Sequence, residues 1–237
     1  MKRLILVHGD KGGTGKSHVA HLTAAAFRSA GHPLLLVDGD AKNAGLHRAF
    51  NGKPDDVLRI NARQAHGSDQ LLEAFLAAET DVLIDLPAGG SDLTARFLGD
   101  GTAEGSVDLG PLLDEVGARL VILFVIDQGR DGLVALNDEF KSISTELADW
   151  IIVRNHRLED TPFTRFETWA TRTDLSQVKV VDMPRLDRRV VEVLVDAKAN
   201  LTELDHLESA SALLKIRGRA ALRIWLETLR GAGLLDA

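Results

Sequence analysis

The segment HGDKGGTGKS, residues 8–17, constrains the fold of this chain more than any other. It lies between two apolar runs and brings three glycines together ahead of a lysine and a serine. Glycines let backbone N–H groups approach a phosphate closely and adopt positive φ. A helix that opens at the lysine adds the partial positive charge of its N-terminus. The segment therefore predicts a strand, a phosphate-binding loop and a helix in succession.

The general phosphate-loop pattern is G-x-x-x-x-G-K-[ST]. Gly15, Lys16 and Ser17 fit its end, whereas its first position falls on Asp10 and Gly9 lies one residue too early. We expect Lys16 to meet the β- and γ-phosphates of a nucleotide and the Ser17 hydroxyl to ligate Mg²⁺. The alternative is a plain strand–turn–helix in which the glycines only make the turn.

Short apolar runs alternate with longer segments of helical pattern along the 237 residues. The runs predict strands at 3–9, 33–40, 80–87, 119–127, 149–155 and 177–184, and a further short strand at 57–61. Helices are expected at 16–30, 68–78, 132–147, 187–198 and 207–230. This alternation predicts an α/β fold in one domain, residues 1–237: a doubly wound, mostly parallel sheet with helices on both faces. The glycine-rich, acidic segment 99–110 is interpreted as a surface loop.

Polar residues follow directly after most of these predicted strands. In an open parallel sheet, ligands bind at the carboxyl ends of the strands. We therefore expect one crevice to collect residues 10–17, Asp38, Asp40, Asp85, Asp127 and Asn155.

The stretch KGGTGKS resembles the deviant Walker A motif, K-G-G-x-G-K-[ST], of the ParA/MinD family of P-loop ATPases. In that family the residue before the first lysine varies, so Asp10 fits the motif. We expect its carboxylate to point away from the phosphate or to pair with a neighbouring basic side chain. The resemblance implies ATP and Mg²⁺ as cofactors. It also implies nucleotide contacts from Gly12, Gly13, Thr14, Gly15, Lys16, Ser17 and His18.

The resemblance gives Lys11 a separate role, that of a signature lysine reaching the nucleotide of the partner subunit in a homodimer formed on ATP binding. The chemistry is consistent with this role, because a cation supplied in trans stabilises the charge that develops on the phosphate oxygens during hydrolysis. The alternative is a solvated loop lysine.

The segment VDGDAKN, residues 37–43, resembles the D-x-D switch of the same family. A spacing of two places both carboxylates on one side of an extended chain. Asp38 is expected beside the magnesium shell and Asp40 beside the attacking water. The family's Pro-Gln-Gly after the second aspartate is replaced here by residues 41–43, Ala-Lys-Asn. Solvated acids in a strand-end turn are the alternative.

The segment VLIDLPAGG, residues 82–90, looks like the Walker B strand. An acid at the end of an apolar strand can hold magnesium-bound water beside the phosphate loop, and Asp85 is that acid. A merely structural strand end is the alternative.

Base recognition is assigned to three residues by the resemblance. Asn155 ends the apolar run IIVRN, and its amide both donates and accepts, as adenine requires; a turn residue is the alternative. Pro184 and Arg185 fall in the family's proline-containing loop near the base. His8, His18 and His21 are interpreted as ordinary loop and helix residues, because nothing completes a zinc site around them.

Composition narrows the function. The chain has no cysteine, which excludes disulfides, thiolate metal sites and the iron–sulfur relatives in the same clan. The net charge of −7 gives an average surface field that does not favour nucleic acid. No apolar run approaches the roughly 18 residues of a membrane helix, so we expect a soluble cytoplasmic protein.

The C-terminal segment 210–235 has the pattern of a basic amphipathic helix. Three interpretations stay open: packing over the sheet, part of a non-specific DNA-binding surface to which RLDRR (185–189) contributes, or contact with a membrane or partner. The phosphate loop starts close to residue 1, so we expect no helix-turn-helix domain before it and no operator-specific binding.

The leading hypothesis is an ATP-dependent dimerising switch with slow hydrolysis and an unidentified activating partner protein. A metabolic ligase or kinase of the same fold, and a nucleotide-binding interaction protein with negligible turnover, remain alternatives.

Overall fold

The structure is a computed structural model that describes residues 1–9, 11–40, 42–50, 57–64, 66–89, 108–158 and 160–236. Its centre is a seven-stranded parallel sheet in the order β3-β2-β4-β1-β5-β6-β7. The strands are β1 (Lys2–His8), β2 (Leu34–Asp38), β3 (Val57–Arg59), β4 (Asp81–Asp85), β5 (Ala118–Ile126), β6 (Ala148–Arg154) and β7 (Lys179–Asp182). The predicted fold class is confirmed.

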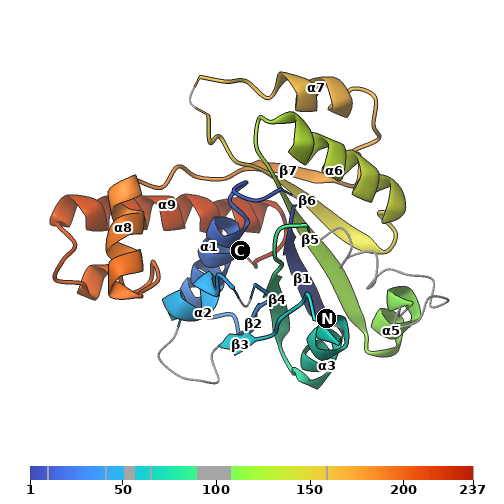
Figure 1. Cartoon of the computed structure of the whole chain (residues 1–237), viewed down its shortest axis with the longest axis horizontal. Coiled ribbons are helices and arrows are strands. Elements are labelled where there is room, and N and C mark those ends of the chain that lie inside the picture. Colours follow the sequence, from blue (N-terminus) through green and yellow to red (C-terminus); the bar gives the residue numbers. More distant parts are fainter. Residues whose placement is uncertain are drawn as a thin grey trace.

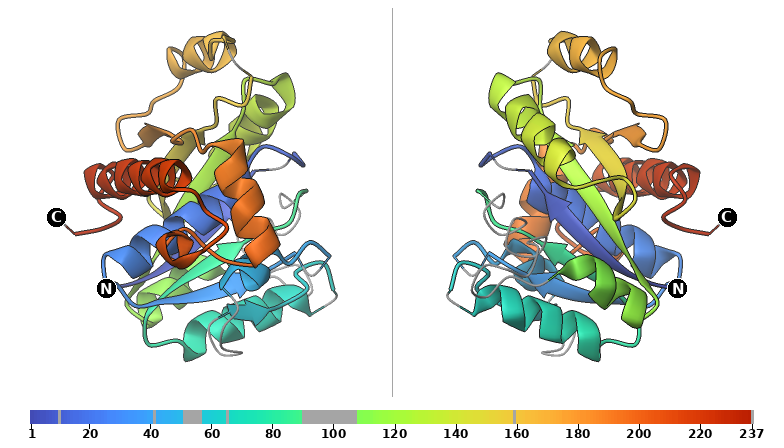
Figure 2. Two further views of the ribbon diagram at one scale, coloured as in Figure 1. Left: turned by 90° about the vertical axis from the view of Figure 1, so that its left-hand side faces the viewer. Right: turned by 90° about the vertical axis from the view of Figure 1, so that its right-hand side faces the viewer.

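Helices cover both faces of the sheet (Figures 1 and 2). One face carries α1 (Lys16–Ser29), α2 (Gly45–Phe50), α8 (Arg188–Ala197) and α9 (Ala212–Gly231). The other carries α3 (Gly67–Ala77), α5 (Leu109–Glu115), α6 (Arg130–Ser142) and α7 (Thr164–Ala170). A short 3₁₀ turn, η2 (Leu204–His206), precedes α9.

Strand residues alternate between the two cores. In β1, Ile5 and Val7 pack under α1, whereas Leu4 and Leu6 pack under α3 and α5. Because both faces are covered, the central strands are nearly continuous apolar runs, which is why the sequence located them.

Several sequence-based boundaries were wrong. Three short helices, α2, α5 and α7, were not predicted, because six or seven residues are too few for a helical period to stand out. The last helix begins at Ala212 rather than at residue 207, where Ser211 caps it by accepting from the Leu214 N–H. The predicted loop 99–110 lies outside the described residues up to 107, and its end belongs to α5.

The chain order reverses at β1, since β4 and β2 lie on one side of it and β5 and β6 on the other. Such a switch point leaves a crevice at the carboxyl ends of the strands. The loop after β1 therefore sits where this fold binds ligands. Within the described residues, no helix has the length and hydropathy to cross a membrane.

Candidate functional site

The phosphate loop joins β1 to α1 and folds tightly back on itself. Gly13 and Gly15 have φ of 79° and 100°, a region that only glycine enters without strain. The Lys16 ammonium donates to the Lys11 carbonyl at 2.8 Å, so it lies across its own loop. The loop thus has the concave backbone and central cation expected of a phosphate cradle; Asp10 lies outside the described residues.

The end of β6 braces this loop. The Asn155 side-chain amide donates to the Thr14 carbonyl at 2.8 Å. A Cβ on Gly15 would lie 2.4 Å from the Asn155 Nδ2, so residue 15 must be glycine for the two segments to meet. The Arg157 guanidinium also donates to the Gly13 carbonyl at 3.0 Å. Sequence reasoning assigned Asn155 to base recognition and did not foresee this contact with the loop. It missed Arg157, whose signal is a cation two residues after the strand-end asparagine.

Two buried carboxylates stand side by side next to the loop. Asp38 and Asp85 are opposite each other in the ladder between β2 and β4 and are only 1% and 2% exposed. Asp38 accepts from the backbone N–H groups of Asp40 and His47. The Asp85 Oδ1 is buried with no hydrogen-bond partner. A buried, unpartnered carboxylate oxygen is costly unless a ligand satisfies it.

The protonation of this pair is perturbed. Burial raises the pKa of Asp85 to about 7, with the neighbouring Asp38 and Asp40 adding to the rise and the Ser17 hydroxyl and Lys16 opposing it. Burial also raises the pKa of Asp38. A divalent cation bound between two adjacent buried acids would stabilise their ionised form, which burial disfavours. Among the described residues no three histidine or acidic side chains form a metal site, so a cation would complete its shell with phosphate and water.

Asp40 lies at the end of the same edge and is half-buried. Its carboxylate accepts from the backbone N–H groups of Lys42 and Asn43 and so caps the turn into α2. Gly39 lies between Asp38 and Asp40 in the chain, and its N–H donates to the Asp85 carbonyl at 3.0 Å. The D-x-D segment and the end of β4 are therefore joined through backbone.

A cavity of about 760 Å³ opens beside the loop. Several sequence-predicted residues line it together: Gly13, Gly15, His18, Asn155, Pro184 and Arg185. Sequence reasoning missed Arg157 and the segment 160–162, which close its other side. We call it the base cavity, because its volume suits a nucleotide base and ribose.

Lys11 does not line this cavity. Its ammonium lies 2.9 Å from the carboxylate of Asp131, in the first turn of α6. Asp127, at the end of β5, instead accepts from the Gly129 N–H at 2.8 Å. Neither Lys11 nor Asp127 is thus engaged at the centre of the loop.

Of the three histidines near the loop, His8 lies apart from His18 and His21, which are one turn apart on α1. His8 is buried and pairs with Glu139 of α6 at 2.5 Å. His18 lines the base cavity, and His21 faces α2.

The basic C-terminal helix, α9, packs on α1. The Trp225 indole is fully buried and donates to the Thr23 hydroxyl at 3.2 Å. Its arginines meet acids on the surface: Arg217 pairs with Asp187, Arg219 with Asp205 and Arg223 with Glu227. The packing interpretation therefore accounts for one face of α9, and the exposed face remains open to the others.

No family model matches the chain. Protein MobD from Acidithiobacillus ferrooxidans is 27% identical over 227 residues, which are 94% of this chain and 93% of MobD. The cell division ATPase MinD of Pyrococcus furiosus superposes with a TM-score of 0.52 at 16% identity, covering 97% of this chain and all of MinD. The septum site-determining protein MinD of Pyrococcus horikoshii, complexed with Mg-ADP, gives 0.53 at 14% identity over the whole of both chains. The resemblance to MinD/ParA-type ATPases is thus confirmed as a shared fold.

Proposed function

We propose that this chain is an ATP-dependent dimerising switch of the ParA/MinD type, which hydrolyses ATP slowly and positions or segregates DNA or another cargo. The observation that carries the proposal is the placement of Lys11 on the phosphate loop. Lys16, Ser17, Asp38 and Asp85 meet at the carboxyl edge of the sheet, whereas Lys11 on the same loop stands outside and exposed.

Within one subunit the residues divide the work. The backbone of Gly12–Gly15 and the Lys16 ammonium bind the phosphates, with Ser17, Asp38 and Asp85 around Mg²⁺. Bound Mg²⁺ would neutralise charge that develops between the β- and γ-phosphates. Asp40 orients the water that attacks the γ-phosphate, and Asn155, Pro184 and Arg185 hold the base. Each assignment rests on the position of the side chain at the edge of the sheet or in the cavity beside it.

Lys11 acts only in the dimer, on the nucleotide of the partner subunit. Freed from Asp131, its ammonium reaches the phosphates bound by the partner, where a cation in trans stabilises the transition state. The Lys11→Ala variant should bind a fluorescent ATP analogue normally but should not dimerise in sedimentation with a slowly hydrolysed analogue. Lys141→Ala, an exposed lysine of α6, is the matched control. A Lys11→Ala protein that dimerises like the control contradicts the proposal.

We propose that the ATP-bound dimer binds DNA, and that the exposed face of α9 contacts it without sequence preference. One subunit carries a net charge of −7 and pairs several α9 arginines with acids, so a single copy should bind poorly. Two copies in the ATP dimer would double the cationic contacts and steepen the salt dependence. DNA binding should be stronger with ATP than with ADP and should weaken with salt; equal binding in both nucleotides contradicts a DNA switch.

Turnover distinguishes the alternatives. Phosphate release stimulated by DNA or a partner protein supports the switch, and release that requires a metabolite supports a ligase or kinase. The protein is proposed to act in the cytoplasm, where ATP is present.

A further inference from the structure

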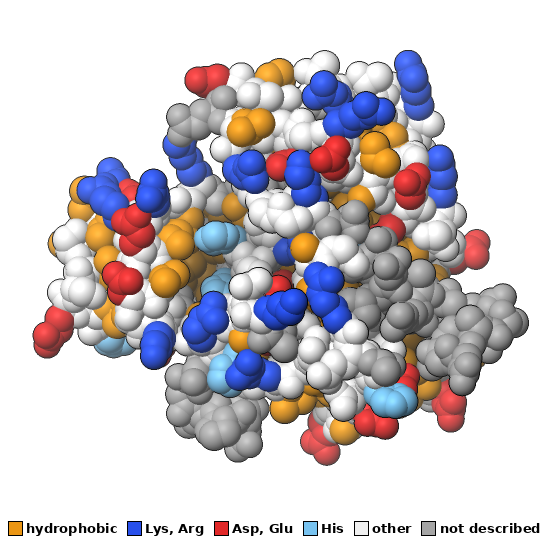
Figure 3. All heavy atoms as spheres, viewed as in Figure 1, with side chains coloured by type: hydrophobic (Ala, Val, Ile, Leu, Met, Phe, Trp, Pro, Cys, Tyr) orange, Lys and Arg blue, Asp and Glu red, His pale blue; other side chains and the backbone are white. Residues whose placement is uncertain are grey.

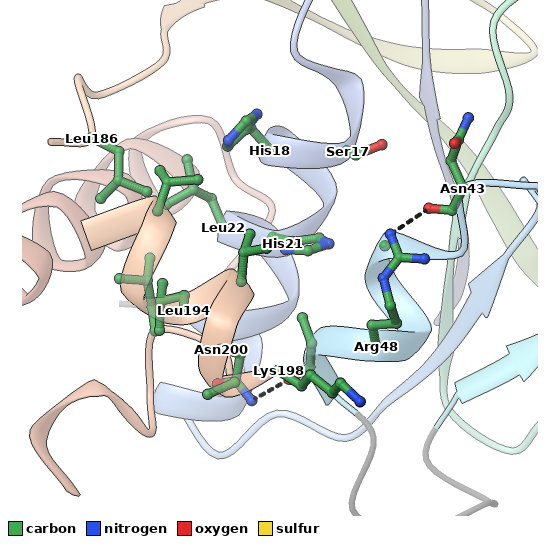
Figure 4. Close-up of a pocket in the computed structure, with 16 residues that line it drawn as sticks. Ser17, His18, His21, Leu22, Asn43, Arg48, Leu186, Leu194, Lys198 and Asn200 are labelled. Atoms are coloured by element: carbon green, nitrogen blue, oxygen red, sulfur yellow. Dashed lines mark hydrogen bonds between the residues drawn. The ribbon is translucent and has the colours of Figure 1, made fainter. Parts of the chain in front are cut away.

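A second cavity adjoins the base cavity along α1. It is enclosed by α1, α2, α8 and the segment that follows α8, and its volume is about 270 Å³ (Figure 4). Leu22, Leu186, Leu194 and Leu201 contribute to its walls. Of the residues given nucleotide roles above, Ser17 and His18 line its edge, and its other lining residues have none of those roles.

The charged groups of this cavity are of one sign. Arg48 and Lys198 line it, and none of its described lining residues is acidic. The Arg48 guanidinium donates to the Asn43 carbonyl at 3.2 Å, which holds it at the α2 side. Apolar walls combined with cations fit a ligand that is apolar at one end and anionic at the other.

His21 adds a second, independent sign of a ligand. Its ring projects from α1 toward α2 in Figure 4, and its Nε2 is buried without a hydrogen-bond partner. Burial lowers the pKa of His21 to about 4, so the ring is neutral at pH 7 and offers one hydrogen bond without charge.

Lys198 occupies a position that backbone geometry would assign to glycine. It is the C-cap of α8 and has φ of 51°, in the left-handed region. Helices commonly end on glycine at such a residue, because a side chain is disfavoured there. A lysine here carries a cation to the cavity at a conformational cost.

The mouth of the cavity is apolar as well. Val195 of α8 is 68% exposed, and on the face in Figure 3 hydrophobic side chains gather over α8 beside a hollow in which histidine side chains are seen. An amphiphile entering here would cover part of this surface.

The cavity shares a wall with the base cavity. His18, Leu186 and Val191 line both. In addition, α2 is tied to the acidic edge, because the His47 N–H donates to Asp38 at 2.9 Å. Any ligand that moves α2 or α8 would therefore act on groups at the nucleotide site.

We propose that this cavity is an effector site for a small anionic amphiphile, its apolar body against the leucines and its carboxylate or sulfonate at Arg48 and Lys198, and that its occupancy is coupled to nucleotide binding. The proposal goes beyond the ATP switch, and its first part holds whether or not the protein dimerises.

The test uses the full chain and 8-anilinonaphthalene-1-sulfonate, a fluorescent anionic amphiphile. We expect saturable one-to-one binding, displaced by octanoate and about tenfold less well by octan-1-ol, which has the same chain without the charge. Equal displacement by the alcohol overturns the assignment of an anionic ligand.

Variants then locate the probe. Lys198→Gly suits the left-handed φ and should fold at least as well as the parent, yet weaken the probe about fivefold; Arg48→Gln should act similarly. Leu194→Trp should fill the cavity and remove binding, whereas Leu76→Trp, on α3 at the opposite face, should not. If Lys198→Gly and Arg48→Gln both bind the probe as tightly as the parent, the proposed effector site is overturned. This result does not depend on whether Leu194→Trp folds.

Coupling is measured by repeating the titration with saturating Mg-ATP. A change of about threefold or more in probe affinity, mirrored by octanoate changing the affinity for a fluorescent ATP analogue, supports the effector role. If Mg-ATP leaves the probe affinity unchanged, the coupling is overturned. If Mg-ATP abolishes the probe fluorescence while Lys198→Gly leaves it intact, the probe binds in the base cavity, and the proposed effector site is overturned. Loss of dimerisation in Lys11→Ala bears only on the switch.

Discussion

The Lys11 ammonium lies 2.9 Å from the Asp131 carboxylate, so the phosphate loop is tied to the first turn of α6 within one subunit. The two side chains are 45% and 70% exposed, so water competes for both partners and the pair opens easily. Its hydrogen bond and charge raise the pKa of Lys11 and lower that of Asp131, so both stay ionised at neutral pH. In the proposed switch, Lys11 must leave Asp131 before it can reach a partner.

Removing the charge of Asp131 should therefore favour the dimer. We expect Asp131→Asn to lower the concentration of a slowly hydrolysed ATP analogue needed for half-maximal dimerisation by about two- to fivefold. Sedimentation velocity measures this, and Asp138→Asn, another exposed acid of α6, is the control. If Asp131→Asn dimerises less readily than Asp138→Asn, the contact assists the dimer instead of restraining it.

The buried Asp85 should make stability depend on pH. Its pKa is 3.8 when unfolded and about 7 when folded, so folding takes up a proton between these values. Stability of the nucleotide- and metal-free protein should then fall as pH rises through this window. Asp85→Asn removes the charge and should raise the Tm by about 3–8 °C at pH 8, with little effect at pH 4.

Calorimetry at the two pH values checks this, with the exposed Asp196→Asn as the control. A Tm gain that is the same at both pH values would show that the benefit does not come from a buried charge. The same variant should lose Mg²⁺-dependent nucleotide binding, because an amide is a weaker Mg²⁺ ligand than a carboxylate.

Gly39 should not tolerate a side chain. A Cβ there would lie 2.8 Å from the backbone carbonyl of Asp85, which cannot swing aside as a side chain would. We expect Gly39→Ala to destabilise the fold by about 1–3 kcal/mol in urea unfolding. Gly110→Ala, in α5 with ordinary contacts at 3.6 Å, should be neutral or stabilising. Equal effects of the two substitutions would argue against the close contact.

Arg157 should support nucleotide binding through its position beside the loop. It donates to the Gly13 carbonyl and lines the base cavity, so Arg157→Gln should weaken a fluorescent ATP analogue about three- to tenfold. Arg165→Gln, exposed on α7, is the control and should leave affinity unchanged. If Arg157→Gln lowers only the thermal stability and leaves nucleotide affinity unchanged, Arg157 stabilises the loop and does not contribute to binding.

The sequence located the sheet and predicted the candidate site, because strands, glycine-rich loops and strand-end acids are recognisable from neighbouring residues alone. Residues 120–126 of β5 are apolar throughout, and the acids at 38 and 85 follow comparable runs directly, so the rule for strand ends predicted that both lie at the carboxyl edge of the sheet. It did not find α7, because seven residues are too few for a helical period to stand out, and it placed the start of α9 five residues too early by overlooking the Ser211 cap. Arg157 and Asp131 escaped because their partners, Gly13 and Lys11, lie more than a hundred residues away.

By itself the sequence determined the alternation of strands and helices, the phosphate loop and the acids that follow the strands, because each is encoded within about ten neighbouring residues. Only the tertiary structure decided that β2 pairs with β4, so that Asp38 and Asp85 stand directly opposite each other. It alone also decided that Lys11 is held by Asp131 and that α8 closes a second cavity against α1. These relations depend on the order of strands in the sheet and on which helix covers which face. Long-range packing sets both, and no local pattern records it.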